Sequence, residues 1–180
     1  MKLHITDKNY KKLLREKMVI LIDTREQNTD IAKAFDEAGI RWKKKALKTG
    51  DFNCMVEGAE ELGWYPYDIW MTDELVIERK NSVDELAGNF AKSDKDSGRI
   101  LREFDRMIGV DRAYLLIEDD SLASIIHHDY RSELNEDAYL RSLLTVQAKN
   151  QMVPLFINKE DMPRMIWEIC KSTIDKHIEK

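Results

Sequence analysis

The stretch Leu75–Asp84 constrains the fold and chemistry of this chain more than any other. Its first residues, Leu75 to Ile77, are apolar and suit a buried strand, and the charged residues Glu78, Arg79 and Lys80 follow at once. Unpaired charge next to a core is costly, so such a strand end needs partners or a metal ion. We therefore take this strand end as the starting point for a candidate site.

Length and composition describe one folded domain. A chain of 180 residues buries about 70 % of its unfolded surface, and 43 % of these residues are hydrophobic. The 29 basic and 34 acidic residues give a net charge of -5, which neither identifies nor excludes a nucleic-acid-binding protein, because a basic groove can lie on an acidic body.

Cysteine usage and hydropathy indicate the compartment. Cys54 and Cys170 lack metal-ligand spacing, so we expect reduced, buried thiols in a cytoplasmic protein. No apolar run approaches the roughly 20 residues of a membrane span, so we expect a soluble intracellular protein without membrane contact.

Strand and helix patterns alternate along the chain. Strands are expected at 18–22, 40–47 (an edge strand), 52–56, 75–78, 114–117 and 153–157. Helices are expected at 8–16, from a cap at Asp30 to Gly39, from a Ser82–Glu85 capping box to Phe90, at 99–108, at 137–149, and from Pro163. Segment 57–72 reads as an irregular connection. This order predicts an α/β fold with a central mixed sheet flanked by helices, and functional groups at the strand ends.

Two acids stand at the ends of two predicted strands. Asp51 opens one strand after a Gly-Asp turn, and Glu78 closes another. If these strands pair as a hairpin, the carboxylates meet, and at about 4 Å they repel by roughly 4 kcal/mol unless a cation lies between them. Oxygen ligands suit Mg²⁺ or Mn²⁺, and Lys80 could hold a water or developing charge. On the residues alone, an ordinary turn and a solvated strand end remain open alternatives.

Three blocks follow one another: Asp23-Thr24-Arg25-Glu26, Gly50-Asp51-Phe52, and Ile77-Glu78-Arg79-Lys80 with Asp84. In order and spacing they resemble the signature of the XPF-type nuclease domain, a member of the restriction-endonuclease-like PD-(D/E)xK superfamily. Gly98-Arg99 and Leu115 to Glu118 look like later landmarks of that domain. The resemblance covers roughly Met18 to Thr173.

The resemblance implies a fold, an activity and partners. It implies the restriction-endonuclease-like fold, with a nuclease core at 18–175 after a helical extension at 1–17, and cutting of branched or flapped DNA beside a junction. We identify no helix-hairpin-helix or helicase domain, so junction preference is expected to depend on a partner, such as an accessory DNA-binding protein. Relatives pair through an apolar face like that of the predicted last helix, so the resemblance also makes a homodimer possible.

The resemblance also implies residue roles. Asp51, Glu78 and the backbone carbonyl of Arg79 would bind the metal ion, Asp23 is a further candidate ligand, and Lys80 would be the catalytic lysine. Glu26 and Asp84 would support the site. Arg25, Arg79 and Arg99 would position phosphates or brace the acids.

Basic and aromatic residues offer DNA contacts. The segment Arg41, Trp42, Lys43, Lys44, Lys45 with Lys48 is expected to contact the DNA backbone, with a solvated edge strand as the alternative. The aromatic residues Trp64, Tyr65, Tyr67 and Trp70 either stack on unpaired DNA or pack over the sheet. His127 and His128 read as structural.

These observations predict a Mg²⁺- or Mn²⁺-dependent DNA endonuclease. The alternative is a catalytically silent DNA-binding or scaffold module of the same fold.

Overall fold

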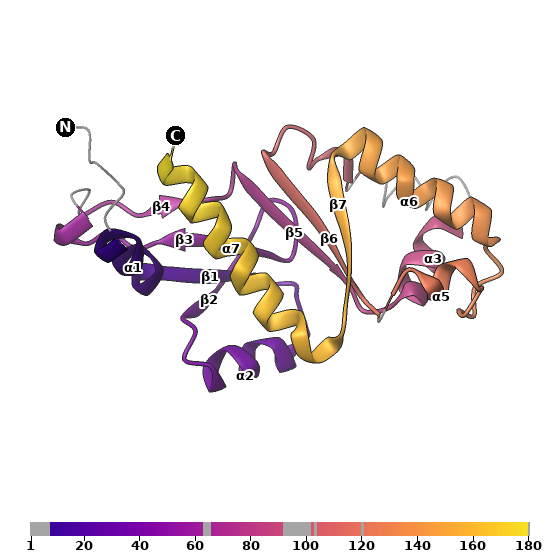
Figure 1. The fold of residues 1–180 in the computed structure, drawn as a ribbon, viewed down its shortest axis with the longest axis horizontal. Coiled ribbons are helices and arrows are strands. Elements are labelled where there is room, and N and C mark those ends of the chain that lie inside the picture. Colours follow the sequence, from indigo (N-terminus) through magenta and orange to yellow (C-terminus); the bar gives the residue numbers. More distant parts are fainter. Residues whose placement is uncertain (1–7, 63–65, 92–101, 103, 120, 180) are drawn as a thin grey trace. The chain divides into compact units, whose positions relative to one another are not determined.

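The computed structural model (Figure 1) describes residues 8–62, 66–91, 102, 104–119 and 121–179. The chain forms two compact units, Met1–Leu75 with Pro163–Lys180 and Val76–Met162. Among the described residues, the strands belong to a mixed seven-stranded sheet flanked by helices. This confirms the predicted fold class.

The first unit combines the N-terminal strands with the last helix. Its elements are α1 (Lys8–Lys17), β1 (Met18–Asp23), α2 (Thr29–Glu37), β2 (Trp42–Lys45), β3 (Phe52–Val56), the 3-10 helix η1 (Glu60–Leu62), β4 (Ile69–Trp70) and α7 (Met162–Glu179). Strand β1 lies parallel to β2 and antiparallel to β3, which pairs antiparallel with β4. The predicted strand 52–56 therefore has the expected bounds.

Two expectations for the first unit need correction. Helix α2 begins at Thr29 with Asn28 as its cap, because the Asn28 side chain accepts a hydrogen bond from the Asp30 backbone N–H. Asp30 is thus not the cap but lies in the first turn, where a negative charge favours the helix dipole. The strand expected at 40–47 is shorter, since only Trp42–Lys45 pairs. Gly39 follows α2 with a φ of +66°, which suits a glycine.

The connection after β3 passes close to its own backbone. The Gly58 N–H donates to Asp68 Oδ1 at 3.0 Å. A Cβ at Gly58 would clash with the backbone carbonyl of Tyr67. The segment predicted as irregular therefore holds η1 and β4 and depends on a glycine. Trp64 and Tyr65 lie outside the described residues.

The second unit is a strand and helix layer. Its elements are β5 (Leu75–Lys80, shared at Leu75 with the first unit), α3 (Val83–Ala91), β6 (Arg112–Glu118), α5 (Ala123–Ile126), α6 (Glu136–Asn150), β7 (Met152–Ile157) and the 3-10 helix η2 (Lys159–Asp161). Strands β6 and β7 are parallel, and α6 packs on β7, α3 and α5. The predicted helix at 99–108 lies partly outside the described residues.

An aromatic group anchors α3 and α6 in the core of the second unit. The Tyr139 ring meets those of Phe90 and Tyr130 edge-on, with centroids 5.7 and 5.3 Å apart. Its hydroxyl donates to the Val83 carbonyl at 2.9 Å. Desolvation by burial, with smaller effects of nearby Tyr130, Asp119 and Asp84, raises the pKa of Tyr139 well above its usual value. The start of α3 is therefore fixed to α6.

The cap of α3 follows the predicted capping box only in part. The Ser82 hydroxyl accepts a bond from the Glu85 N–H at 3.1 Å, as expected. The Glu85 carboxylate instead accepts bonds from the backbone and side chain of Asn81. The reciprocal bond thus reaches one residue further back. None of the helices in the described part of the chain is long and apolar enough to cross a membrane.

Candidate active site

Asp23, at the end of β1, is a buried carboxylate held on both oxygens. Oδ1 accepts bonds from the backbone N–H and Nε of Arg25 at 2.8 and 2.6 Å, and Oδ2 accepts one from the Leu47 N–H at 2.7 Å. Burial acts to raise the pKa of Asp23, but these hydrogen bonds outweigh it and the pKa lies below its usual value. The contacts favour a bracing role for both Asp23 and Arg25.

Asp51 follows a turn that glycine makes possible. Gly50 is buried with a φ of +76°, a conformation that side chains disfavour. The Asp51 carbonyl accepts a bond from the Asp23 N–H at 2.8 Å, so the two predicted acids stand on neighbouring strand ends. The Glu26 side chain accepts a bond from the Asn28 N–H at 2.7 Å, next to the start of α2.

Glu78 and Lys80 form a buried ion pair at the end of β5. The Lys80 Nζ lies 2.7 Å from Glu78 Oε1, and the two side chains are 8 % and 4 % exposed. They lie two residues apart on a strand, so both project from the same face. Glu85 Oε1 lies 3.9 Å from the same ammonium, although the sequence indicated Glu85 only as part of a capping box. An amine is thus held between two carboxylates.

Arg79 projects from the opposite face of β5. Its Nη2 lies 3.2 Å from Glu118 Oε2 at the end of β6, and its side chain is buried. The guanidinium therefore ties two strand ends of the second unit together, as a bracing residue would.

Asp84 binds a loop residue that sequence reasoning missed. Its Oδ1 accepts a bond from the Arg131 N–H at 2.6 Å, and its Oδ2 lies 3.3 Å from Arg131 Nε. No local pattern connects two residues so far apart in sequence, so only the fold reveals this pair. Asp84 thus holds the loop between α5 and α6.

The predicted metal ligands come from both units. Asp51 belongs to the first unit and Glu78 to the second, so their meeting stays a prediction. Across the residues that the structure describes, no cluster of three or more His, Cys, Asp or Glu is placed to hold a metal ion. The donor set itself, carboxylates with a backbone carbonyl, fits the hard cations Mg²⁺ and Mn²⁺.

The side chains of the predicted DNA-binding segment have different partners. The Lys44 ammonium donates to the carbonyl of Glu26 at 2.7 Å, and the Trp42 Nε1 donates to Asp36 at 2.8 Å. Lys43 and Lys45 instead extend over the Trp70 ring. Lys48 is exposed in the following loop, and Arg99 lies outside the described residues.

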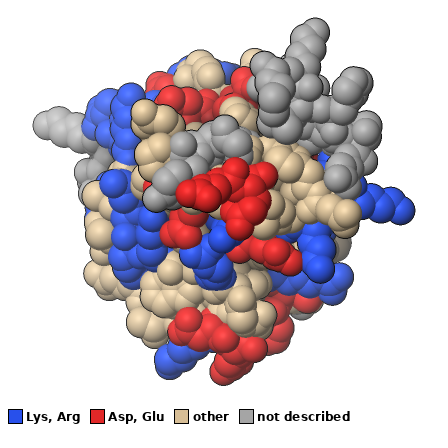
Figure 2. Space-filling model, turned by 90° about the vertical axis from the view of Figure 1, so that its left-hand side faces the viewer, with Lys and Arg blue, Asp and Glu red and all other residues tan. Residues whose placement is uncertain are grey.

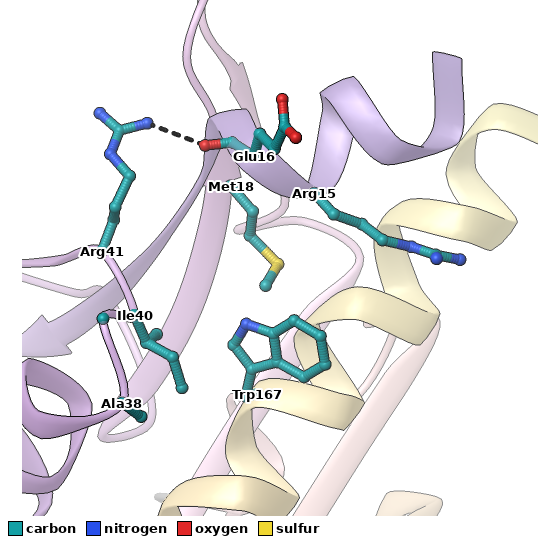
Figure 3. Close-up of a pocket in the computed structure, with 8 residues that line it drawn as sticks. Arg15, Glu16, Met18, Ala38, Ile40, Arg41 and Trp167 are labelled. Atoms are coloured by element: carbon teal, nitrogen blue, oxygen red, sulfur yellow. Dashed lines mark hydrogen bonds between the residues drawn. The ribbon is translucent and has the colours of Figure 1, made fainter. Parts of the chain in front are cut away.

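Arg41 lies at a pocket of about 510 Å³ in the first unit (Figure 3). Its guanidinium pairs with Glu57 and donates to the Glu16 carbonyl at 3.4 Å. Trp167 of α7 and Met18 point into the pocket in the same view. The lining comprises Arg15, Glu16, Met18, Ala38, Gly39, Ile40, Arg41 and Trp167. Arg41 is therefore engaged within the protein.

The charges on the face drawn in Figure 2 are mixed. Lys and Arg side chains gather at the left of that view, and Asp and Glu side chains gather beside them near its centre. A nucleic acid that met this face would therefore be guided by local groups of cations rather than by a field of one sign.

Comparisons with known proteins give the family and the fold of the chain. A family model described as the ERCC4 domain matches residues 22–162. The solved structure of XPF from Aeropyrum pernix aligns with a TM-score of 0.58 at 15 % identity, over 87 % of this chain and 65 % of that one. XPF from Aeropyrum pernix in complex with DNA aligns with a TM-score of 0.59 at 16 % identity, over 88 % and 66 %.

The chain thus spans about two thirds of the length of these solved chains. At this identity the likeness establishes the fold. No curated protein sequence matches the chain. The family model covers residues 22–162 and with them the three motif blocks, so the resemblance to an XPF-type nuclease domain is confirmed and the chain belongs to the ERCC4 domain family.

Proposed function

We propose that this chain is a metal-dependent DNA endonuclease that hydrolyses phosphodiester bonds in branched, flapped or single/double-strand junction DNA. The observation that carries the proposal is the buried Glu78–Lys80 pair at a strand end, in a chain of the ERCC4 domain family. A carboxylate and an ammonium together offer a metal ligand and a donor to the phosphate, two groups that this reaction needs.

Lys80 acts at the reacting phosphate. Its ammonium is held by Glu78 and approached by Glu85, in surroundings that exclude most water. A fixed cation stabilises developing negative charge more strongly in such surroundings than in bulk water. Lys80 therefore donates to a phosphoryl oxygen or orients the attacking water.

The acids hold the cofactor. Asp51, Glu78 and the Arg79 carbonyl bind Mg²⁺ or Mn²⁺, while Asp23 braces Arg25 and the backbone at Leu47. The bound cation supplies Lewis-acid polarisation of the phosphoryl oxygen and a water of lowered pKa. Glu26 supports the turn at the start of α2, and Asp84 supports the loop at Arg131.

The partner in this proposal is DNA. In this proposal a second copy of the chain or an accessory DNA-binding protein adds further contacts to the junction.

The test is a cleavage map on splayed-arm, flap and nicked duplex DNA in Mg²⁺ or Mn²⁺. We expect cutting beside the junction, its loss in chelator, and its loss in Asp51→Asn and Glu78→Gln. Glu37→Gln, which changes an exposed acid of α2, is the matched control and should cut like the wild type. Cutting that both site variants retain would refute the proposal. Binding to DNA in chelator without any metal-dependent cutting would favour the silent DNA-binding module.

A further inference from the structure

The sheet of the first unit has two faces with different coverings. Paired residues of neighbouring strands project to the same side. Lys43 lies opposite Leu21, Val19 lies opposite Met55, and Met55 lies opposite Trp70. We call this side the lysine face; it carries Lys43, Lys45, Val19, Leu21, Met55 and Trp70.

The opposite face packs against helices. Cys54 of β3 touches α7, because its thiol lies 3.8 Å from the Cys170 carbonyl. Trp42 of β2 reaches α2 through Asp36. Lys44, which alternates with Lys43 and Lys45 along β2, also projects to this side. The three lysines of β2 are therefore not equivalent.

The lysine face combines an aromatic ring with two cations. Its apolar base is a small buried cluster formed by Val19, Leu21, Leu47 and Met55. The ammonium groups of Lys43 and Lys45 lie 5.2 and 5.1 Å from the centroid of the Trp70 ring, which is 39 % exposed. A partly exposed ring with cations at its face is the combination that holds unpaired bases and the phosphates between them.

The lysine face leads to the predicted acids of the same unit. Lys45 lies opposite Asp23 in the register of β1 and β2. The Asp23 N–H in turn donates to the Asp51 carbonyl at 2.8 Å. A strand of DNA lying along Trp70, Lys43 and Lys45 would therefore end beside the acidic strand ends.

We propose that Trp70, Lys43 and Lys45 form a binding site for unpaired DNA, in which a base stacks on Trp70 and the two ammonium groups contact flanking phosphates. The inference rests on the proposed function, since it names the part of a branched substrate that this site takes. It assigns the stacking role to Trp70. The Trp42 side chain projects to the opposite face of β2, where its ring nitrogen donates to Asp36. A competing structural role, in which the lysine stems only shield Trp70 and the cluster beneath, predicts no effect of charge on binding.

The experiment measures binding of a labelled oligo-dT of about 15 nucleotides and of a blunt duplex, in chelator, across a series of salt concentrations. Lys43→Gln with Lys45→Gln keeps most of the stems and removes both charges. We expect the slope of log affinity against log salt for oligo-dT to fall by about 1.4, because each single-strand phosphate contact contributes about 0.7. Trp70→Leu should weaken oligo-dT binding by roughly 5- to 100-fold, and duplex binding much less, while Trp70→Phe keeps most of the affinity.

Matched controls separate a site from general charge. Lys33→Gln removes one charge from exposed α2 and should leave the slope unchanged. Lys44→Gln should lower the slope by much less than Lys43→Gln. An equal effect of Lys44→Gln and Lys43→Gln overturns the inference, and so does an unchanged slope in the double variant. Thermal unfolding confirms that each variant is folded.

The two proposals fail separately. If the protein binds oligo-dT through Trp70 and the two lysines but cuts no DNA, the binding-site proposal stands and the nuclease proposal is refuted. If the protein cuts junction DNA in Mg²⁺ while Trp70→Leu and the Lys43→Gln with Lys45→Gln double variant both bind oligo-dT like the wild type, the nuclease proposal stands and the binding-site proposal is refuted.

Discussion

Two apolar strands of this chain end in a buried acid, and the two acids are held by different kinds of donor. Asp23 accepts bonds from two backbone N–H groups and a guanidinium, which stay charged or fixed under all ordinary conditions. Glu78 pairs with the ammonium of Lys80, a compact charge on a flexible stem. The first arrangement suits a structural tie, and the second suits a site where charge and protons move.

Neutralising Glu78 is the strongest test of the difference between Asp23 and Glu78. Glu78→Gln should lower the single-turnover rate on flap DNA by at least about 10²-fold, because it removes a carboxylate that we propose as a ligand of the metal ion. The far-ultraviolet circular dichroism spectrum should not change. A folded variant that cuts at the wild-type rate would show that Glu78 is as structural as Asp23.

Removing the ammonium should affect stability as well. Lys80→Met leaves the Glu78 charge buried without its amine, so we expect a loss of about 3 kcal/mol in urea unfolding. The double variant Glu78→Gln with Lys80→Met should regain much of that loss, since no buried charge is left behind. Additive losses would mean that the two side chains do not interact as a pair.

Asp23→Asn tests the structural tie, with an expected loss of about 1–3 kcal/mol at pH 7. The pKa of Asp23 is lowered in the folded state, so its contribution is complete above the unfolded value of about 3.9 and disappears as the pH falls through the folded value. The stability gap between wild type and variant should therefore close below about pH 4. Asp73→Asn, at an exposed position, should change stability by less than about 0.5 kcal/mol at every pH. A gap that stays constant with pH would contradict the role of the carboxylate charge.

Substitutions at two glycines, one in each unit, should change the free energy of unfolding by smaller amounts and in opposite directions. Gly58→Ala should destabilise by about 1–2 kcal/mol, because the new methyl group meets the fixed carbonyl of Tyr67. Gly88→Ala, in the middle of α3 with open space around it, should stabilise by about 0.5–1 kcal/mol. Urea unfolding of the two variants gives both values. If Gly58→Ala left stability unchanged, the connection before β4 would be able to shift, and the position of Trp70 would not be fixed by it.

The strands were readable from sequence where burial was complete. β1 and β3 are buried along their whole length, so an apolar run marks each of them with an error of at most one residue. β5 continues through Glu78, Arg79 and Lys80, because these charges find partners and do not need water at the strand end. β4 and α5 escaped prediction, since two and four residues carry no measurable periodicity.

For the candidate site, the motif blocks named the acids and Lys80, whose roles stay predictions. A motif does not say which donors hold a carboxylate. The contacts of Asp23 with the Leu47 backbone and of Asp84 with Arg131 join positions 24 and 47 residues apart. The division of the β2 lysines between two faces depends on strand register, which a run of consecutive lysines leaves open.

The last helix has a consequence for the order in which the chain folds. Helix α7 completes the unit that begins with α1: Cys170 contacts β3, and Arg15 pairs with Asp175 at 2.7 Å across 160 positions. Until residues 163–180 leave the ribosome, the helix-covered face of the first sheet lacks this partner, whereas residues 76–162 already hold their own core. The core of the second unit can therefore form before the first unit is complete during synthesis.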